Sequence, residues 1–329
     1  MSDHASSQGG DSPPPTKERE QALPGRATKT TSSGRIDDSG GAATPKARPK
    51  SRLAKLVQEA RAIEAEAAME AGAIGYMARA LVLATMPHRR REGPEFTRRN
   101  GKFTMSLLAP SHVGLPYGSV PRLLVAWVTT EAVRTRRREL VLGSTLSEFM
   151  RRMDLETNGG LTGRIRPLKE QMRRLFSSSV SCTYESDGKF AIETVNMVDS
   201  ARLWWHPKSP EQACLWSSTL TLGERFFEEI VERPVPVDLR ALRALRGSPL
   251  ALDVYCWLTY RLSYTRKPLV VPWEALEAQF GSDYSETRYF RRNFAQRLKA
   301  VCSVYPDAQV SLRPAGLHLR PSRTHVAKR

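Results

Sequence analysis

The sequence contains no run of roughly 20 consecutive apolar residues, the length that a helix needs to cross a bilayer. This absence argues against a membrane-spanning protein. The segment from Met1 to Asp11 also lacks the apolar centre of a secretory signal peptide. We therefore expect a cytoplasmic protein with no membrane partner.

Cysteine is scarce, with four residues in the whole chain, and no two of them form a Cys-x-x-Cys pair. Zinc fingers and thiol redox motifs therefore have no support. Free cysteine is among the most often buried residue types. The sequence predicts four reduced packing residues, Cys182, Cys214, Cys256 and Cys302.

Motifs for catalysis are also missing. There is no Gly-x-x-x-x-Gly-Lys-Ser/Thr loop to hold phosphates, which argues against an ATP-driven helicase or loader of that type. The six histidines are scattered, and none forms the closely spaced pair that a metal-dependent DNA nickase would use beside its tyrosine nucleophile. We expect no catalytic residues, no metal and no cofactor, and an origin nickase stays as a minor alternative.

Basic residues are in large excess, since 51 Lys and Arg against 34 Asp and Glu give a formal net charge of +17. The predicted pI is about 10.1. Such an excess favours an anionic partner, either a nucleic acid backbone or an acidic membrane surface. A length of 329 residues with 40% hydrophobic residues is enough for two ordinary domains with their own cores.

The chain before the first domain divides into two parts. Residues 1–50 are rich in Ser, Gly, Pro and Thr and have almost no large apolar side chains, which predicts a disordered tail. Residues 51–100 are predicted to be a helical segment followed by a basic linker. Apolar residues at helical spacing indicate one or two helices from Ser51 to Met86, and Pro87 ends them. The arginine-rich stretch 88–94 then has two interpretations, a solvated linker or a contact to phosphates.

A first domain is predicted over residues 101–205. Thr145 and Glu148 have the spacing of a capping box, and Pro167 is compatible with a helix only in or near its first turn. The predicted elements are a strand at 103–107, a helix at 121–137, a strand at 139–142, helices at 145–153 and 164–176, and a hairpin at 180–195.

A second domain is predicted over residues 206–329, with Asp238, Ser248 and Ser285 as helix caps. Its elements are a strand at 215–222, helices beginning at 238 and 248, a strand at 269–271, helices at 272–280 and 285–302, and a hairpin at 310–319. Helix, short strand, helix, turn, helix and hairpin is the order of a winged helix. The predicted fold class is therefore α+β, with two tandem winged-helix domains preceded by a disordered tail and a helical segment.

The third helix of each domain has an apolar stripe and a separate basic face, as a helix that reads the major groove requires. The stripes are Ile165, Leu168, Met172 and Leu175 in the first domain, and Phe290, Phe294, Leu298 and Val301 in the second. Such basic faces can also be merely solvated. The predicted DNA-binding residues are Arg166, Lys169 and Arg173 in the first helix, Arg288, Arg291, Arg292, Gln296 and Lys299 in the second, and Lys189 and Arg313 in the two hairpins.

The chemistry of these side chains suggests which of them read bases and which bind phosphates. Arg can pair with the guanine edge and Gln with the adenine edge through two hydrogen bonds, so Arg288, Arg292 and Gln296 suit base reading. Lysines more naturally hold phosphates, and the hairpin residues suit the minor groove or the backbone. The second helix is thus the better candidate for reading sequence.

Several long stretches resemble the replication-initiator (RepA) proteins of bacterial plasmids. The resemblance covers roughly Gly75 to Arg320. The stretches are GYMARALVLATMPHRRREGPEFTRRN starting at Gly75, GLPYGSVPRLLVAWVTTEAVRTRRRELVLGSTLSEFM at Gly114–Met150, LKEQMRRLF at Leu168–Phe176 and SPLALDVYCWLTYRLSY at Ser248–Tyr264.

This resemblance implies tandem winged helices that bind directly repeated sequences (iterons) in double-stranded DNA of a plasmid origin. It further implies melting of adjacent AT-rich DNA, recruitment of the host initiator and replicative helicase in the bacterial cytoplasm, and homodimerisation for repression of the protein's own gene. The alternative is a winged-helix transcriptional regulator without a replication role.

Overall fold

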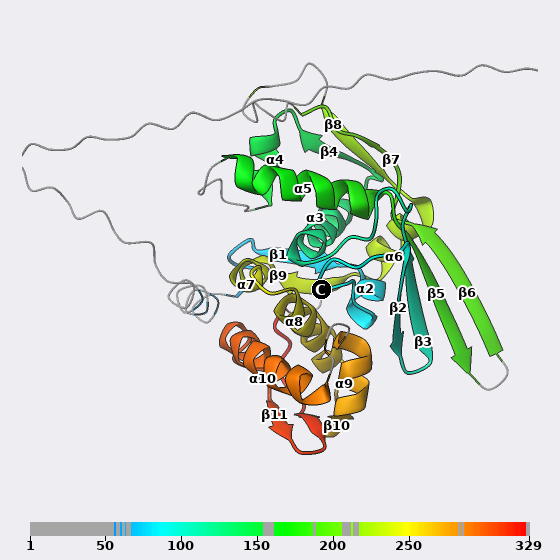
Figure 1. Cartoon of the computed structure of the whole chain (residues 1–329). Coiled ribbons are helices and arrows are strands. Elements are labelled where there is room, and N and C mark those ends of the chain that lie inside the picture. The colour runs from blue at the N-terminus through cyan, green and yellow to red at the C-terminus, as the bar shows by residue number, and fades with distance from the viewer. Residues whose placement is uncertain are drawn as a thin grey trace, which may run out of the picture. The chain divides into compact units, whose positions relative to one another are not determined.

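Four antiparallel sheets and the helices between them make up the part of the chain that the structure, a computed structural model, describes (Figure 1). The described residues all belong to a unit that begins at Pro49. They are 56, 60, 63, 67–153, 161–186, 189–205, 212, 217–281, 284 and 286–326. The tail predicted at 1–50 lies outside them.

The largest sheet has the strand order β2-β3-β5-β6. Its inward side chains meet in register, with Met105 opposite Cys182 and Val180 opposite Val195. A second sheet has the order β4-β8-β7. The strands are β2 (Glu95–Asn100), β3 (Phe103–Leu108), β5 (Ser179–Ser186) and β6 (Lys189–Asn196), then β4 (Glu139–Gly143), β8 (Ser218–Leu222) and β7 (Val198–Arg202).

The two smaller sheets have the orders β10-β12-β11 and β1-β9. The pairing of β1 with β9 joins segments that are far apart in the chain, because Ile74 lies opposite Asp238. The strands are β10 (Leu269–Pro272), β12 (Gly316–Leu319) and β11 (Val310–Arg313), then β1 (Ile74–Met77) and β9 (Val235–Asp238).

Three of the described helices, α4, α7 and α8, begin at side-chain caps. Thr145 Oγ1 accepts a hydrogen bond from Glu148 N at 3.0 Å, and Ser248 Oγ accepts one from Ala251 N at 3.3 Å, as predicted. The helices are α2 (Arg79–Leu83), α3 (Ser119–Thr135), α4 (Leu146–Arg152), α5 (Leu161–Phe176), α6 (Glu224–Glu232), α7 (Leu239–Leu245), α8 (Pro249–Leu262), α9 (Trp273–Phe280) and α10 (Thr287–Val304).

Aromatic side chains form the centres of both halves of the core. In the first half, Phe149 stacks on Trp205 with ring centroids 5.0 Å apart and meets the edge of Trp127 at 5.1 Å. In the second half, Phe294 lies 5.5 Å from Phe290 and 5.9 Å from Trp273. Edge-to-face and offset pairs of this kind add to the gain from burial.

The described cysteines are free thiols: Cys182 and Cys302 are half-buried and Cys256 is buried. Burial raises the pKa of the Cys182 thiol to about 11 and also raises the pKa of Cys302. Such thiols are protonated and unreactive at neutral pH. Cys214 lies outside the described residues.

Two expectations for residues 51–100 need correction. The described residues 56, 60 and 63 are helical as predicted, and α2 is a short helix, but the described part of this region also contains the strands β1 and β2, which were not predicted. Both strands pair with partners later in the chain, and local periodicity cannot reveal such pairing. The stretch 88–94 is not a free linker either, because the side chain of His88 is only 7% exposed and contacts Asp253.

The first predicted winged helix also differs from the expectation. Its element order is present, but the hairpin β5-β6 extends a four-stranded sheet through β3, and β4 pairs with β8 instead. Pro167 lies well inside α5, which begins at Leu161. The expectation that Pro167 lies in the first turn is therefore wrong, and the helix forgoes one backbone hydrogen bond there.

From Asp238 onward the second half follows the predicted order, whereas α6 and β9, which precede α7, were not predicted. The short strand β10 pairs with β12 of the C-terminal hairpin, with Leu269 opposite Leu319. The helices α9 and α10 come between β10 and that hairpin in the chain. Ser285, the predicted cap of α10, lies outside the described residues.

Candidate nucleic-acid interface

The helix α5 has the two faces that its sequence predicts. Its apolar stripe is buried, with Leu168 and Met172 almost fully covered. On the other side Arg166 and Arg173 are exposed, while Lys169 is half-buried and its Nζ donates to Trp205 O at 3.3 Å. The three predicted basic residues therefore lie on one side of the helix, although Lys169 is less accessible than the two arginines.

A basic groove of about 670 Å³ runs between α5 and the loop that precedes α3. The loop is held to the helix because Arg173 Nη2 donates to His112 O at 3.5 Å and Tyr117 N donates to Gln171 Oε1 at 2.9 Å. The groove is lined by His112, Val113, Ile165, Arg166, Lys169, Glu170, Arg173 and Arg174.

Arg174 belongs to this groove but was not among the predicted residues. It is buried, its Nη1 donates to Leu115 O at 3.1 Å, and it forms an ion pair with Glu170 at 2.8 Å. These contacts make it a support for the loop. Its position four residues after Glu170 is the only signal in the sequence that indicates this pairing.

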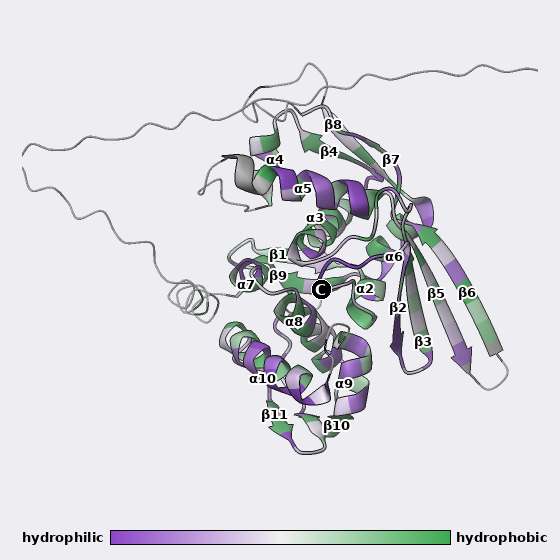
Figure 2. Ribbon diagram, viewed as in Figure 1, coloured by the Kyte–Doolittle hydropathy of each residue, from purple (hydrophilic) through white to green (hydrophobic). Residues whose placement is uncertain are grey.

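The helix α10 places an aromatic core under a basic surface. Phe290, Phe294 and Val301 are fully buried. All five predicted residues on its other side are exposed, and Figure 2 shows hydrophilic colours on the outward turns of both α5 and α10. The five are Arg288, Arg291, Arg292, Gln296 and Lys299.

The arginines of α10 are oriented by aromatic rings and carboxylates. The guanidinium of Arg288 lies 4.8 Å from the Tyr289 ring, and its Nε is 2.7 Å from Glu286 Oε2. Arg292 lies 5.6 Å from the same ring, and Arg291 lies 5.2 Å from the ring of Trp273. Cation–π contacts of this kind restrict side chains without neutralising them, so the charge of Arg292 stays available to an anionic ligand. The charges of Arg288 and Arg291 are partly offset by Glu286 and Glu274.

The two predicted hairpin residues lie in different sheets, Arg313 in β11 and Lys189 in β6. Arg313 is exposed at the end of β11, and its carbonyl accepts a hydrogen bond from Trp273 Nε1 at 3.2 Å, which ties the C-terminal hairpin to α9. Lys189 begins β6, in the four-stranded sheet, and its side chain lies outside the described residues.

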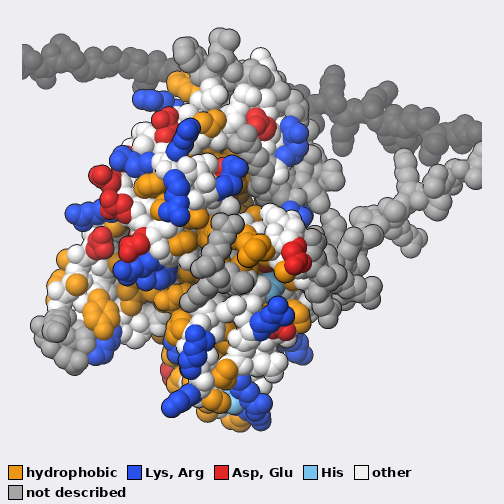
Figure 3. All heavy atoms as spheres, turned by 180° about the vertical axis from the view of Figure 1, so that it is seen from behind, with side chains coloured by type: hydrophobic (Ala, Val, Ile, Leu, Met, Phe, Trp, Pro, Cys, Tyr) orange, Lys and Arg blue, Asp and Glu red, His pale blue; other side chains and the backbone are white. Residues whose placement is uncertain are grey.

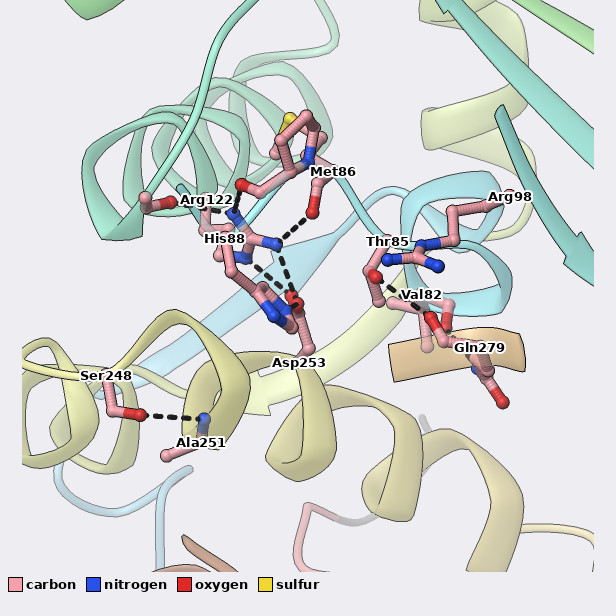
Figure 4. A network of polar contacts seen from close by, with 12 residues as sticks. Val82, Thr85, Met86, His88, Arg98, Arg122, Ser248, Ala251, Asp253 and Gln279 are labelled. Carbon is pink, nitrogen blue, oxygen red and sulfur yellow. Dashed lines mark hydrogen bonds and ion pairs between the residues drawn. The ribbon is translucent and has the colours of Figure 1, made fainter. Parts of the chain in front are cut away.

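A buried ion cluster joins α3, α8 and the segment before β2 (Figure 4). Arg122 Nε donates to Asp253 Oδ1 at 2.7 Å, and His88 Nε2 lies 2.8 Å from Asp253 Oδ2. Arg122 Nη2 donates to Asp253 Oδ2 at 2.7 Å and to Met86 O at 2.6 Å, and Nη1 donates to Gly118 O at 2.7 Å and to Pro87 O at 3.2 Å. The pair Arg122–Asp253 is therefore fully enclosed and fully hydrogen-bonded, as a buried charge pair requires.

The cluster shifts the titration of its members. Burial raises the pKa of Asp253, but the charge of Arg122 and the hydrogen bonds from His88 and Arg122 outweigh it, so the pKa lies below its ordinary value. Burial lowers the pKa of His88, and the hydrogen bond to Asp253 opposes this only in part. At neutral pH His88 is therefore uncharged beside an ionised Asp253.

A second contact ties the same segment to α9. Gln279 Nε2 donates to the carbonyls of Val82 and Leu83 at 3.2 and 3.1 Å, and Thr85 Oγ1 donates to Gln279 O at 3.0 Å. Arg98 Nη1 adds a bond of 3.4 Å to the carbonyl of Ala278. The segment 82–98 thus holds the second half of the chain against the first.

The stability of the protein should depend on pH through this cluster. Because the folded state disfavours the charged form of His88, the unfolded chain binds the proton more readily, and the free energy of unfolding should fall as pH drops below 6.5. Burial also lowers the pKa of His325, which should add to the effect. Urea unfolding between pH 7.5 and 5.5 measures this slope. The dependence of the unfolding free energy on pH should become shallower in His88→Gln. It should stay unchanged in the control His112→Gln, because His112 is an exposed residue in a loop. An unchanged slope in His88→Gln would show that His88 does not cause the pH dependence.

Charge on the opposite face of the molecule is mixed. In the view from behind, Lys and Arg side chains are interspersed with acidic and hydrophobic ones (Figure 3). That face therefore does not offer one continuous basic surface, which leaves the faces of α5 and α10 as the better candidates.

Residues 115–274 match the family model described as plasmid encoded RepA protein. Over this segment the chain is similar to the RepA family. The matched segment runs from within the loop before α3 into α9, so it contains Arg122, Asp253 and α5 but ends before α10. The resemblance inferred from the sequence is thereby confirmed for this segment, and the match supports a role in replication initiation.

One solved structure shares the fold of this chain. Domains 2 and 3 of RctB, in a crystal structure of selenomethionine derivatives, cover 75% of this chain and 99% of their own, with a TM-score of 0.51 and 10% identity. A second crystal structure of RctB domains 2–3 covers 67% of this chain and 82% of its own, with a TM-score of 0.43 and 12% identity. No curated protein sequence matches the chain. Among the described residues, no helix is both long enough and apolar enough to span a membrane.

Proposed function

We propose that this protein is a plasmid replication initiator that binds double-stranded origin DNA through α5 and α10. The observation that carries the proposal is α10, a helix with a buried aromatic core and five exposed polar residues aligned on its outer face. The RepA match over residues 115–274 supports the assignment to replication.

In this proposal the second half of the chain is a winged helix. β10, α9, α10 and the hairpin β11-β12 provide the strand, two helices and wing, and the pairing of β10 with β12 supports it. α10 then enters the major groove and Arg313 on the hairpin reaches the backbone or minor groove. The first half supplies a second contact through α5, without a free two-stranded wing.

The remaining parts of the proposal come from the family. The sites are direct repeats (iterons) at the origin, the protein opens adjacent AT-rich DNA without catalysing a reaction, and it recruits the host initiator and helicase in the bacterial cytoplasm. A homodimer represses the protein's own gene. A supercoiled origin plasmid incubated with the protein and Mg²⁺ or Mn²⁺ tests the non-enzymatic part, because a covalently linked nicked product would contradict it.

Arg292→Ala is expected to weaken binding to the preferred repeat by about 1–3 kcal/mol and to relax the preference at one base position. Its guanidinium is exposed and oriented by the Tyr289 ring. Competition binding on repeats altered at each position in turn measures the effect. Lys299→Ala, on the same helix, serves as the control and should weaken all sequences alike; identical base preferences in wild type and Arg292→Ala would remove this residue from base reading.

Arg166→Ala is expected to weaken binding to all sequences and to reduce the slope of log K against log salt by about 0.9, because one phosphate contact is lost. Arg166 is exposed beside the basic groove on α5. Titrations at several salt concentrations measure this slope. Arg225→Ala, an exposed arginine on α6, is the matched control, and an unchanged slope in Arg166→Ala would place this end of α5 outside the interface.

A further inference from the structure

The arginine-rich loop before β2 is anchored at both ends. At its start, His88 is held by Asp253, and the carbonyl of Pro87 accepts a hydrogen bond from Gly118 N at 3.1 Å. At its end, the carbonyl of Pro94 accepts one from Ala109 N at 2.8 Å. The backbone between these anchors is short, so little conformational entropy remains to be lost when a ligand binds there.

The loop presents a concentrated positive charge. Arg89, Arg90 and Arg91 are all exposed, and only Glu92 opposes them within the loop. The guanidinium of Arg91 lies 5.6 Å from the ring of Phe96, which supports the side chain without removing its charge. Three consecutive exposed arginines on an anchored backbone suit an extended anion better than a single small one.

The anchors connect this loop to both candidate DNA-binding helices. On one side, the loop that contacts Arg173 through His112 O also supplies Gly118 N to Pro87. On the other side, Asp253 lies in α8, which packs against α10. Figure 4 shows His88 between α3 and α8, next to Arg122. The loop is thus connected to α5 and to α10 by short chains of direct contacts.

We infer that Arg89, Arg90 and Arg91 form a third DNA contact, which holds backbone phosphates of the duplex between the segments bound by α5 and α10. This inference rests on the proposed function. Guanidinium groups bind phosphate oxygens through paired, charge-assisted hydrogen bonds, and phosphate contacts fix register without reading sequence. The buried pair Arg122–Asp253 and His88 act as positioning residues, because they fix the backbone that presents the three arginines.

The test compares wild type with the triple variant Arg89→Gln, Arg90→Gln, Arg91→Gln. We expect weaker binding to every sequence, unchanged base preference, and a slope of log K against log salt that is smaller by roughly 2.7, since each of the three phosphate contacts contributes about 0.9. In hydroxyl-radical footprints of origin repeats, protection between the two major-groove contacts should disappear while the flanking protections remain. The substituted side chains are exposed, so the thermal unfolding midpoint should stay as in wild type.

The matched control removes the same charge elsewhere, through Arg202→Gln, Arg225→Gln and Arg233→Gln, which are exposed on β7, on α6 and just after it. This control should keep the wild-type slope and footprint. Equal slopes in the loop variant and wild type, with wild-type protection between the two contacts, would overturn the third contact alone. Failure of wild type to bind origin repeats would instead overturn the proposed function and this inference together.

Discussion

Asp253→Ala is expected to lower the free energy of unfolding by about 3–5 kcal/mol, because it leaves the charge of Arg122 buried without its partner. Arg122 is 2% exposed and both carboxylate oxygens of Asp253 accept hydrogen bonds from its guanidinium at 2.7 Å. Water cannot replace the lost carboxylate unless the contact between α3 and α8 opens. Loss of Asp253 also removes the partner of His88 and so loosens the arginine loop.

Urea unfolding followed by circular dichroism measures this effect. The matched control is Asp199→Ala, which removes the partner of Arg138 from an ion pair of 2.8 Å, only 0.1 Å longer than Arg122–Asp253, with side chains 38% and 42% exposed. That change should cost less than about 1 kcal/mol, since water solvates the freed arginine. Similar losses in both variants would mean that the buried cluster does not hold the two halves together.

The second large effect is expected for Phe294→Ala, which should lower the free energy of unfolding by about 3–5 kcal/mol through lost burial and the cavity left behind. Phe294 is fully buried, and the rings of Phe290, Trp273 and Phe280 lie 5.5, 5.9 and 6.0 Å away. No single neighbour can fill the space without leaving its own position.

The control for this variant is Tyr289→Ala on the same helix, where the ring is 39% exposed. It should cost much less stability but should weaken DNA binding, because Tyr289 orients Arg288 and Arg292. Thermal unfolding and DNA binding measured on both variants separate the two roles. Equal stability losses would contradict the distinction between a buried core face and an exposed binding face on α10.

Patterns in the sequence predict those parts of the fold that depend on interactions between residues close together in the chain. The apolar stripe and basic face of α10, the caps at Thr145 and Ser248, and the C-terminal hairpin all follow from spacing along a few residues. In each case the interacting groups lie within one or two turns of one another in the chain.

Long-range pairing is what the sequence does not reveal. β1 pairs with β9, and β5 pairs with β3, over separations that no local period encodes. His88 therefore looked like part of a basic linker, although it contacts Asp253, 165 residues away in the chain. The sequence does contain a signal for the pairing of Arg122 with Asp253. Each is a single charge inside an otherwise apolar helical stretch, and the two charges have opposite signs. Charged side chains are rarely buried unless they are paired.

The central claim, that the two helices bind duplex origin DNA, is tested most directly by hydroxyl-radical footprinting of the wild-type chain on a plasmid origin that carries direct repeats. We expect protection in each repeat at two positions about one helical turn apart, one for α5 and one for α10, with loss of the α10 position in Arg292→Ala. Protection no greater on the repeats than on unrelated DNA, or a single inverted repeat protected at the promoter alone, would contradict it.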